Sequence, residues 1–157
     1  MSERTTQYST FTLERQFDAS PSQVFKAWAD PSVKARWFFG TPGKWKEKIR
    51  EFNFRVGGRE RLIGTWTGGM VSTFDAYYLD IVPDRRVVYS YGMHHDDRKI
   101  SISQATVEFI PAGSGTRMTF TEQAVFLDGY DDAGGRKKGT GALLDQLKAA
   151  LSGKPAG

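Results

Sequence analysis

The sequence predicts an α+β protein in which a curved antiparallel β-sheet wraps around one long C-terminal helix, with two short helices after the first strand. Three observations lead to this prediction. Apolar and polar residues alternate on both sides of Gly57-Gly58, and further alternating segments follow as far as Glu122. Helical spacing is confined to regions near the two ends of the chain. Consecutive strands without intervening helices pair as an antiparallel meander, which a terminal helix can cover.

The N-terminal region contains one strand followed by two helix starts. Residues 10–17 alternate and are expected to form the first strand. Ser20-Pro21 provides an N-cap oxygen and a first helical residue that needs no hydrogen-bonded N–H, so a short helix is expected to begin there. Asp30-Pro31 ends this helix and begins a second one, in which Val33 and Trp37 share a face.

Turn residues separate the strands of the central region. After a loop over residues 41–48, Gly57-Gly58 is expected to form a tight hairpin, because glycine readily adopts positive φ. Further turns are expected at Gly68-Gly69, at Pro83-Asp84 and at residues 112–115.

The last helix is indicated by leucines that fall on one face, namely Leu143, Leu144, Leu147 and Leu151. Asp131 or Asp132 is expected at its start, where a carboxylate favours the helix dipole. The glycines around Thr140 are expected to remove side-chain bulk where this helix crosses the sheet. We therefore predict a single domain over residues 8–153, with terminal tails over 1–7 and 154–157.

Composition excludes several kinds of site. The chain has no cysteine, so disulfides and thiolate metal sites are excluded. His94-His95 lies in an expected polar turn, and adjacent side chains on an extended chain point to opposite sides. The acidic loop with Asp128, Asp131 and Asp132 lacks the alternating ligands of a calcium loop. We predict no metal, no cofactor and no catalytic residue that a known motif identifies.

The location and partners follow from similar reasoning. No apolar run resembles a signal peptide or approaches the roughly 20 residues of a membrane span, so a cytoplasmic protein without membrane contact is expected.

A formal charge of +4 invites a nucleic-acid interpretation. The basic tract alternates with apolar residues, however, which is typical of a half-buried strand with a solvated basic face. We predict no nucleic-acid partner, and a monomer or homodimer. The basic residues of this tract are Lys44, Lys46, Lys48, Arg50, Arg55, Arg59 and Arg61.

The order and spacing of several short motifs resemble one family. Residues 18–28, followed by Asp30-Pro31 and Arg36-Trp37, are similar to the opening of the activator of heat-shock protein 90 ATPase homologue-like proteins, of the START-like (SRPBCC) superfamily. Residues 55–58, 83–89 and 115–119 carry further matches. The resemblance implies a helix-grip fold with a cavity between sheet and helix for small apolar molecules. It implies no fixed catalytic residues.

Thr140 departs from this family pattern. Family members often place Gly-Trp at the start of the last helix, whereas this chain has Gly139-Thr140. We expect the smaller side chain to open the cavity.

Strand alternation predicts which side chains face the cavity. Phe109, Phe120 and Glu122 are expected to point inward, as are Tyr89 and Tyr91. Other candidates for the ligand site are Trp37, Glu60, Trp66, Tyr77, Thr140, Leu144 and, in a strand without a bulge, Asp75.

Glu60 and Glu122 occupy unusual positions for carboxylates, because both share a strand face with apolar residues. Each is expected either to contact a ligand or to pair with an arginine, unless a bulge turns it outward.

Three functions remain open. The first is binding of a small hydrophobic or amphipathic molecule in the cavity. The second is an enzyme, such as a cyclase or lyase on an aromatic or polyketide-like substrate, with an inward carboxylate as general acid or base. The third is a chaperone-interaction module, which the family's name implies.

Overall fold

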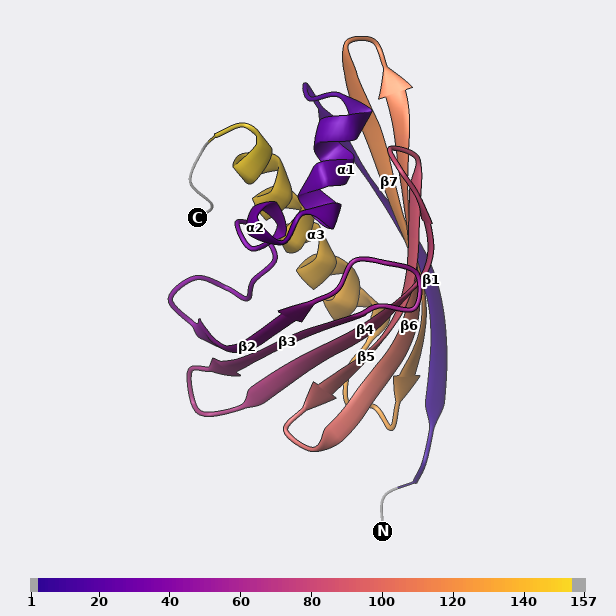
Figure 1. The fold of residues 1–157 in the computed structure, drawn as a ribbon. Coiled ribbons are helices and arrows are strands. Elements are labelled where there is room, and N and C mark those ends of the chain that lie inside the picture. Colours follow the sequence, from indigo (N-terminus) through magenta and orange to yellow (C-terminus); the bar gives the residue numbers. More distant parts are fainter. Residues whose placement is uncertain (1–2, 154–157) are drawn as a thin grey trace.

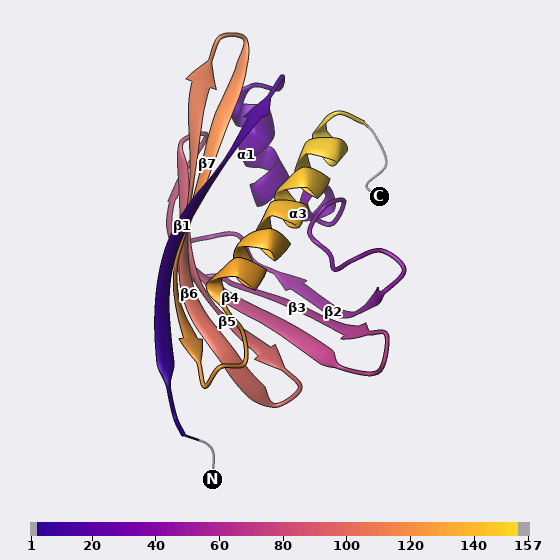
Figure 2. The same ribbon diagram turned by 180° about the vertical axis from the view of Figure 1, so that it is seen from behind.

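The computed structural model describes residues 3–153, in which seven antiparallel strands form one curved sheet and three helices lie on its concave side (Figures 1 and 2). The predicted α+β class and helix-grip arrangement are thus confirmed. The elements in chain order are β1 (Thr6–Phe17), α1 (Pro21–Ala29), α2 (Pro31–Lys34), β2 (Trp45–Phe52), β3 (Arg59–Trp66), β4 (Val71–Val82), β5 (Arg86–His95), β6 (Arg98–Ala112), β7 (Gly115–Leu127) and α3 (Ala133–Leu151).

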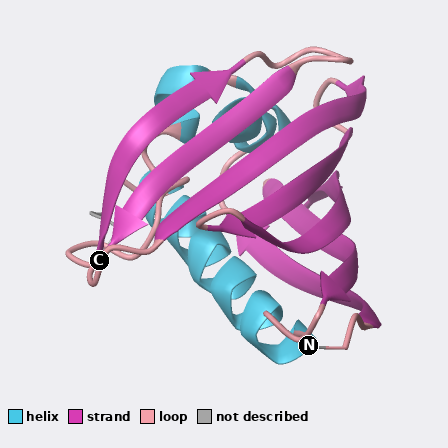
Figure 3. Ribbon diagram, turned by 90° about the horizontal axis from the view of Figure 1, so that it is seen from below, coloured by secondary structure: helices cyan, strands magenta, loops and turns pink. Residues whose placement is uncertain are grey.

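The sheet is a meander of six strands, β2 to β7, to which the first strand is added beside β7. Its strand order is β1-β7-β6-β5-β4-β3-β2, so β1 lies beside the last strand, and β1 and β2 form the two edges. The sheet remains open between these edges. Helix α3 crosses the concave face, as Figure 3 shows from below. This leaves a layer between helix and sheet where the core and any cavity must lie.

Capping residues start each helix as the sequence predicts. Ser20 Oγ accepts from the backbone N–H of Gln23, while Gln23 Oε1 accepts from the N–H of Ser20, which completes a capping box. Asp30 accepts from the N–H groups of Ser32 and Val33 at the start of α2. Asp132, one of the two expected residues, accepts from the N–H of Gly135 at 2.8 Å and begins α3.

The first strand extends further than expected. Thr6 and Gln7 pair with Leu127 and Phe126, although both fall in the expected N-terminal tail. The other expected tail, residues 154–157, lies outside the described residues, as do Met1 and Ser2.

The expectation of a tight hairpin turn at Gly57-Gly58 is wrong, because the loop that connects the two strands is longer. Strand β2 already begins at Trp45, within the expected loop, and ends at Phe52, so a six-residue loop over 53–58 joins it to β3. Gly57 does adopt positive φ, at 83°. The expected turns at Gly68-Gly69, Pro83-Asp84 and 112–115 are present, and each contains a residue with positive φ.

Gly58 is the last residue of this loop and lies close to backbone carbonyl groups of the same loop. This contact leads to a first testable prediction. A Cβ at this position would collide with the carbonyl oxygen of Asn53 and lie 2.9 Å from that of Arg55. Gly58→Ala is therefore expected to lower the free energy of unfolding by about 1–3 kcal/mol, measured by urea denaturation.

Gly139→Ala is the matched control for this prediction. A Cβ at Gly139 would meet no other described atom within 4 Å outside its own helix and chain neighbours. Alanine is also a better helix former, so the control is expected to gain about 0.5–1 kcal/mol. Equal stability of Gly58→Ala and the parent would show that the loop backbone moves aside without cost.

Candidate functional site

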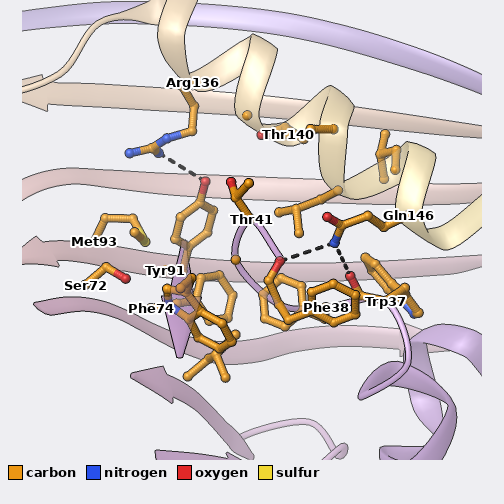
Figure 4. A pocket seen from close by; sticks show the side chains of 18 of the residues that line it. Trp37, Phe38, Thr41, Ser72, Phe74, Tyr91, Met93, Arg136, Thr140 and Gln146 are labelled. Carbon is orange, nitrogen blue, oxygen red and sulfur yellow. Dashed lines mark hydrogen bonds between the residues drawn. The ribbon is translucent and has the colours of Figure 1, made fainter. Parts of the chain in front are cut away.

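A cavity of about 300 Å³ lies between α3 and the concave face of the sheet (Figure 4). Its walls are mostly aromatic, with Phe74 and Tyr91 from the sheet and Phe38 from the segment after α2. Thr41 and Gly139, which also line it, are exposed to solvent. The cavity therefore opens between the loop that precedes β2 and the N-terminal half of α3.

Eight of the twelve expected site residues line this cavity. They come from the segment after α2, from the three strands β3, β5 and β7, and from α3, so distant parts of the sequence meet here. They are Trp37, Trp66, Tyr89, Tyr91, Phe120, Glu122, Thr140 and Leu144.

Two expected residues lie on the opposite face of the sheet. Tyr77 is 46% exposed, and its ring lies under the guanidinium of Arg59. Asp75 also points outward and forms an ion pair with Arg59 at 2.8 Å. The expectation that these two side chains face the cavity is wrong, and a bulge explains why.

The bulge inserts Leu79 into β4. Tyr78 pairs with Tyr89 and Asp80 pairs with Val88, which leaves Leu79 without an opposite residue. Counting back in twos from Ile81 predicts Tyr77 inward, but the extra residue reverses the alternation. Tyr78, only 1% exposed, points inward instead.

Phe109 and Glu60 are buried but do not line the cavity. The Phe109 ring packs edge-on against Phe25, with centroids 5.7 Å apart, and belongs to the core beneath α1. Glu60 pairs with a lysine and not with the expected arginine, since its Oε1 lies 2.6 Å from Lys34 Nζ. The hydroxyl of Tyr78 donates to the same oxygen at 2.5 Å.

The Lys34–Glu60 pair is surrounded by aromatic rings. Lys34 and Glu60 are 2% and 3% exposed, and Lys34 Nζ lies 4.6 Å from the ring centroid of Phe38 and 5.0 Å from that of Phe52. Burial lowers the pKa of Lys34, and the attraction of Glu60 opposes that shift. A buried lysine of this kind gives no signal in the sequence, because lysine side chains are normally exposed.

Glu122 forms the polar end of the cavity. Its side chain is fully buried on β7, and Oε1 accepts a hydrogen bond from the hydroxyl of Tyr91 at 2.6 Å. Its Oε2 accepts from the hydroxyl of Ser103 at 3.1 Å and from Arg136 Nη1 at 3.3 Å. Figure 4 shows Arg136 reaching from α3 to the hydroxyl of Tyr91. Glu122 thus pairs with an arginine, one of the two expected alternatives, and it also lines the cavity.

The pKa values of Tyr91 and Arg136 in this cluster are both raised, but for different reasons. Burial, together with the charge of Glu122, raises the pKa of Tyr91, so its hydroxyl stays protonated at neutral pH. Burial alone would lower the pKa of Arg136, but attraction by Tyr91, Glu122 and Asp131 outweighs it and leaves the pKa raised. Arg136 therefore remains a cation that links helix and sheet.

Arg136 is the main cavity residue that the sequence analysis misses. It lies four residues before Thr140 on α3, and residues at this spacing share a helix face, so the pattern held a usable signal. Phe74, inward because of the same bulge, and Met93 were missed as well.

Gln146 connects α3 to the cavity's opening. Its Nε2 donates to the backbone oxygens of Trp37 at 2.7 Å and Phe39 at 3.2 Å. The α3 glycines differ in their surroundings. Gly139 borders open space and leaves volume to the cavity, whereas a Cβ at Gly141 would lie 3.5 Å from Arg15 Nη2 of β1. The expectation that these glycines remove bulk where the helix crosses the sheet therefore fits Gly141 and not Gly139.

Neither a metal cluster nor a membrane-spanning helix is found in residues 3–153. No three His, Asp or Glu side chains of this part of the chain gather closely enough to share an ion. None of its helices is long and apolar enough to cross a membrane.

Solved structures share this fold along nearly the whole chain. A protein from Rhizobium leguminosarum is 40% identical and superimposes with a TM-score of 0.91, covering 98% of this chain and 100% of its own. The Mll3558 protein from Rhizobium loti is 44% identical with a TM-score of 0.86, covering 93% and 99%. Protein CV1439 from Chromobacterium violaceum is 25% identical with a TM-score of 0.75, covering 90% and 96%.

No protein with a curated description matches the chain. A family profile does match residues 18–152, which include α1, α2, six strands and α3. The profile describes the Activator of Hsp90 ATPase homolog 1-like proteins, whose START-like (SRPBCC) fold is a ligand-binding fold, and the chain belongs to this family.

Proposed function

We propose that this protein binds a small hydrophobic or amphipathic molecule in the cavity between the sheet and α3. The observation that carries the proposal is the cavity itself, about 300 Å³ in volume, walled by aromatic rings and ending in one buried polar cluster. Apolar walls with a few placed polar groups are typical of small-molecule sites. Aromatic contact would supply most of the binding free energy, while the polar cluster at the end of the cavity would orient the ligand.

An enzymatic role has one observation in its favour. Glu122 lies within hydrogen-bond distance of a second titratable group, the hydroxyl of Tyr91. Yet three donors hold the carboxylate, and the raised pKa of Tyr91 makes this hydroxyl a poor acid at neutral pH. The geometry therefore favours binding over catalysis.

Thr140→Trp tests the proposal. Thr140 is nearly buried and lines the cavity, and the added side-chain volume is on the order of 100 Å³, about a third of the space. We expect the variant to fold, to lose about 1–3 kcal/mol of stability through overpacking, and to bind an apolar fluorescent probe about tenfold more weakly. Probe titration and thermal melting measure the two effects.

Lys138→Trp is the control, because Lys138 is exposed on the same helix and does not line the cavity. It adds an aromatic ring to α3 without filling the space. Native mass spectrometry of freshly purified parent protein would identify a co-purified ligand directly. Equal probe binding by parent and Thr140→Trp would contradict the proposal.

A further inference from the structure

We propose that the ligand of this cavity is an organic cation, a protonated amine on an aromatic or aliphatic body, and that carboxylates are excluded. This inference rests on the proposed function and adds the ligand's chemical class. It follows from the charges that line the cavity, from the hydrogen bonds they already make, and from the aromatic walls.

The charges lining the cavity sum to a negative value. The charged side chains are Glu122, Asp131 and Arg136, two carboxylates against one guanidinium. Both carboxylates share that guanidinium, at 3.3 Å for Glu122 and 3.2 Å for Asp131. The nearby imidazole of His95 adds no positive charge at neutral pH, because burial lowers its pKa. One positive charge on a ligand would balance the site.

The strongest donors that face the cavity are already engaged. Arg136 Nη1 donates to Tyr91 and Glu122, and Nη2 donates to Ser101 Oγ at 2.6 Å and to Asp131. Gln146 uses its amide hydrogens on two backbone oxygens. A carboxylate that approached Arg136 would either compete with these bonds or use the remaining Nε–H. In both cases it would lie near the like charges of Glu122 and Asp131, which is costly in a buried site.

Acceptors, in contrast, remain available. The carboxylate of Asp131, whose side chain is 25% exposed, can accept further hydrogen bonds, while the fully buried Glu122 contributes its charge. Within residues 3–153 the Oε1 atom of Gln146 accepts no hydrogen bond, and the hydroxyl of Tyr89 makes none. A neutral hydroxyl such as that of Tyr89 can donate or accept, but it does not compensate the charge of a buried anion. The unused hydrogen-bond acceptors of the cavity thus suit a ligand that donates hydrogen bonds.

The aromatic walls favour a cation for a second reason. Trp45, Trp66 and Phe74 border the space, and the faces of such rings attract ammonium groups. The protein already holds one ammonium in this way, since Lys34 Nζ lies over the rings of Phe38 and Phe52 beside Glu60. The cavity repeats this combination of rings and carboxylates, without a lysine to fill it.

Three probes of matched shape test the inference, namely 2-naphthylmethylamine, 2-naphthylmethanol and 2-naphthoate, compared by isothermal titration calorimetry at neutral pH. We expect the amine to bind about tenfold more tightly than the alcohol, and the carboxylate to bind most weakly. Asp131→Asn should remove most of the amine's advantage and leave the affinity of the alcohol unchanged. Asp145→Asn is the matched control, because Asp145 lies on the exposed side of α3 and its loss changes the net charge equally.

The outcomes separate the two proposals. If the alcohol binds but the amine has no advantage, or if the carboxylate binds best, the cation inference is overturned while the binding function stands. An amine advantage that Asp145→Asn reduces as much as Asp131→Asn also overturns it, since the effect then comes from overall charge. If no probe binds, the proposed function fails, and the inference fails with it.

Discussion

Glu60→Ala is expected to lower the free energy of unfolding by about 3–5 kcal/mol. Removing this carboxylate leaves the ammonium of Lys34 buried without its partner, so the lysine must either remain charged in an apolar cage or release its proton. Urea denaturation at neutral pH measures the loss. Burial lowers the pKa of Lys34 in the parent, and the loss of Glu60 removes the attraction that opposes this shift. The pKa of Lys34 therefore falls further in the folded variant, which binds fewer protons than the folded parent while the unfolded chains still bind the proton. The deficit should therefore shrink as the pH rises.

Two further variants distinguish the effect of losing a buried ion pair from that of losing a partly exposed one. Asp75→Ala removes the partner of Arg59 from a partly exposed pair on the outer face of the same sheet, and is expected to cost about 0–1 kcal/mol. Lys34→Met combined with Glu60→Leu removes both charges and is expected to be more stable than Glu60→Ala. Similar losses in Glu60→Ala and Asp75→Ala would show that Lys34 and Glu60 are hydrated in solution.

The three buried tyrosines are together expected to lower the free energy of unfolding by about 4 kcal/mol between about pH 9 and about pH 11, and Lys34 is expected to offset part of this loss. Burial raises the pKa values of Tyr78, Tyr89 and Tyr91 above the ordinary 10.0. The folded state thus keeps three protons that the unfolded chain releases, and each such tyrosine contributes about 1.4 kcal/mol per pH unit above its unfolded pKa. Lys34 acts in the opposite direction below pH 10.5, but it is one group against three.

Unfolding curves across this pH range test the prediction, and the ultraviolet absorbance of tyrosinate shows when the buried rings ionise. Tyr89→Phe is the control, because its hydroxyl makes no hydrogen bond within the described residues and its loss removes only a titrating group. The pH dependence of this variant should be about a third shallower. Ionisation of all tyrosines before the protein unfolds would contradict the burial of this cluster.

Much of the fold could be predicted because its determinants are local. Glycine pairs, Pro83-Asp84 and the capping residues Ser20 and Asp132 each determine backbone geometry within a few residues. The 53–58 loop could not be predicted in detail. Its shape depends on contacts such as Gly57 N–H donating to the carbonyl of Tyr78, a residue that lies on another strand.

The side chains that face the cavity could be predicted on strands with uninterrupted alternation. On β4, where a bulge breaks the alternation, the prediction was wrong. Tyr89, Tyr91, Phe120 and Glu122 follow the period of two on their strands, and all four line the space. On β4 the extra residue Leu79 reverses the alternation. A bulge is determined by how two strands fit together, so the sequence of one strand does not reveal it. The ion-pair partner of a buried carboxylate likewise depends on residues distant in the sequence, as the pairing of Glu60 with Lys34 shows.

The open edge of the sheet at β2 has a consequence for self-association. An unpaired strand exposes N–H and C=O groups that can capture another chain and start aggregates. Strand β2 has only eight residues, its register breaks between Glu47 and Ile49, and it carries Lys46 and Lys48. Short length, a bulge and lysines are the features that keep edge strands from joining one another. Two lysines of the basic tract, Lys46 and Lys48, thus oppose fibre-like assembly through this edge.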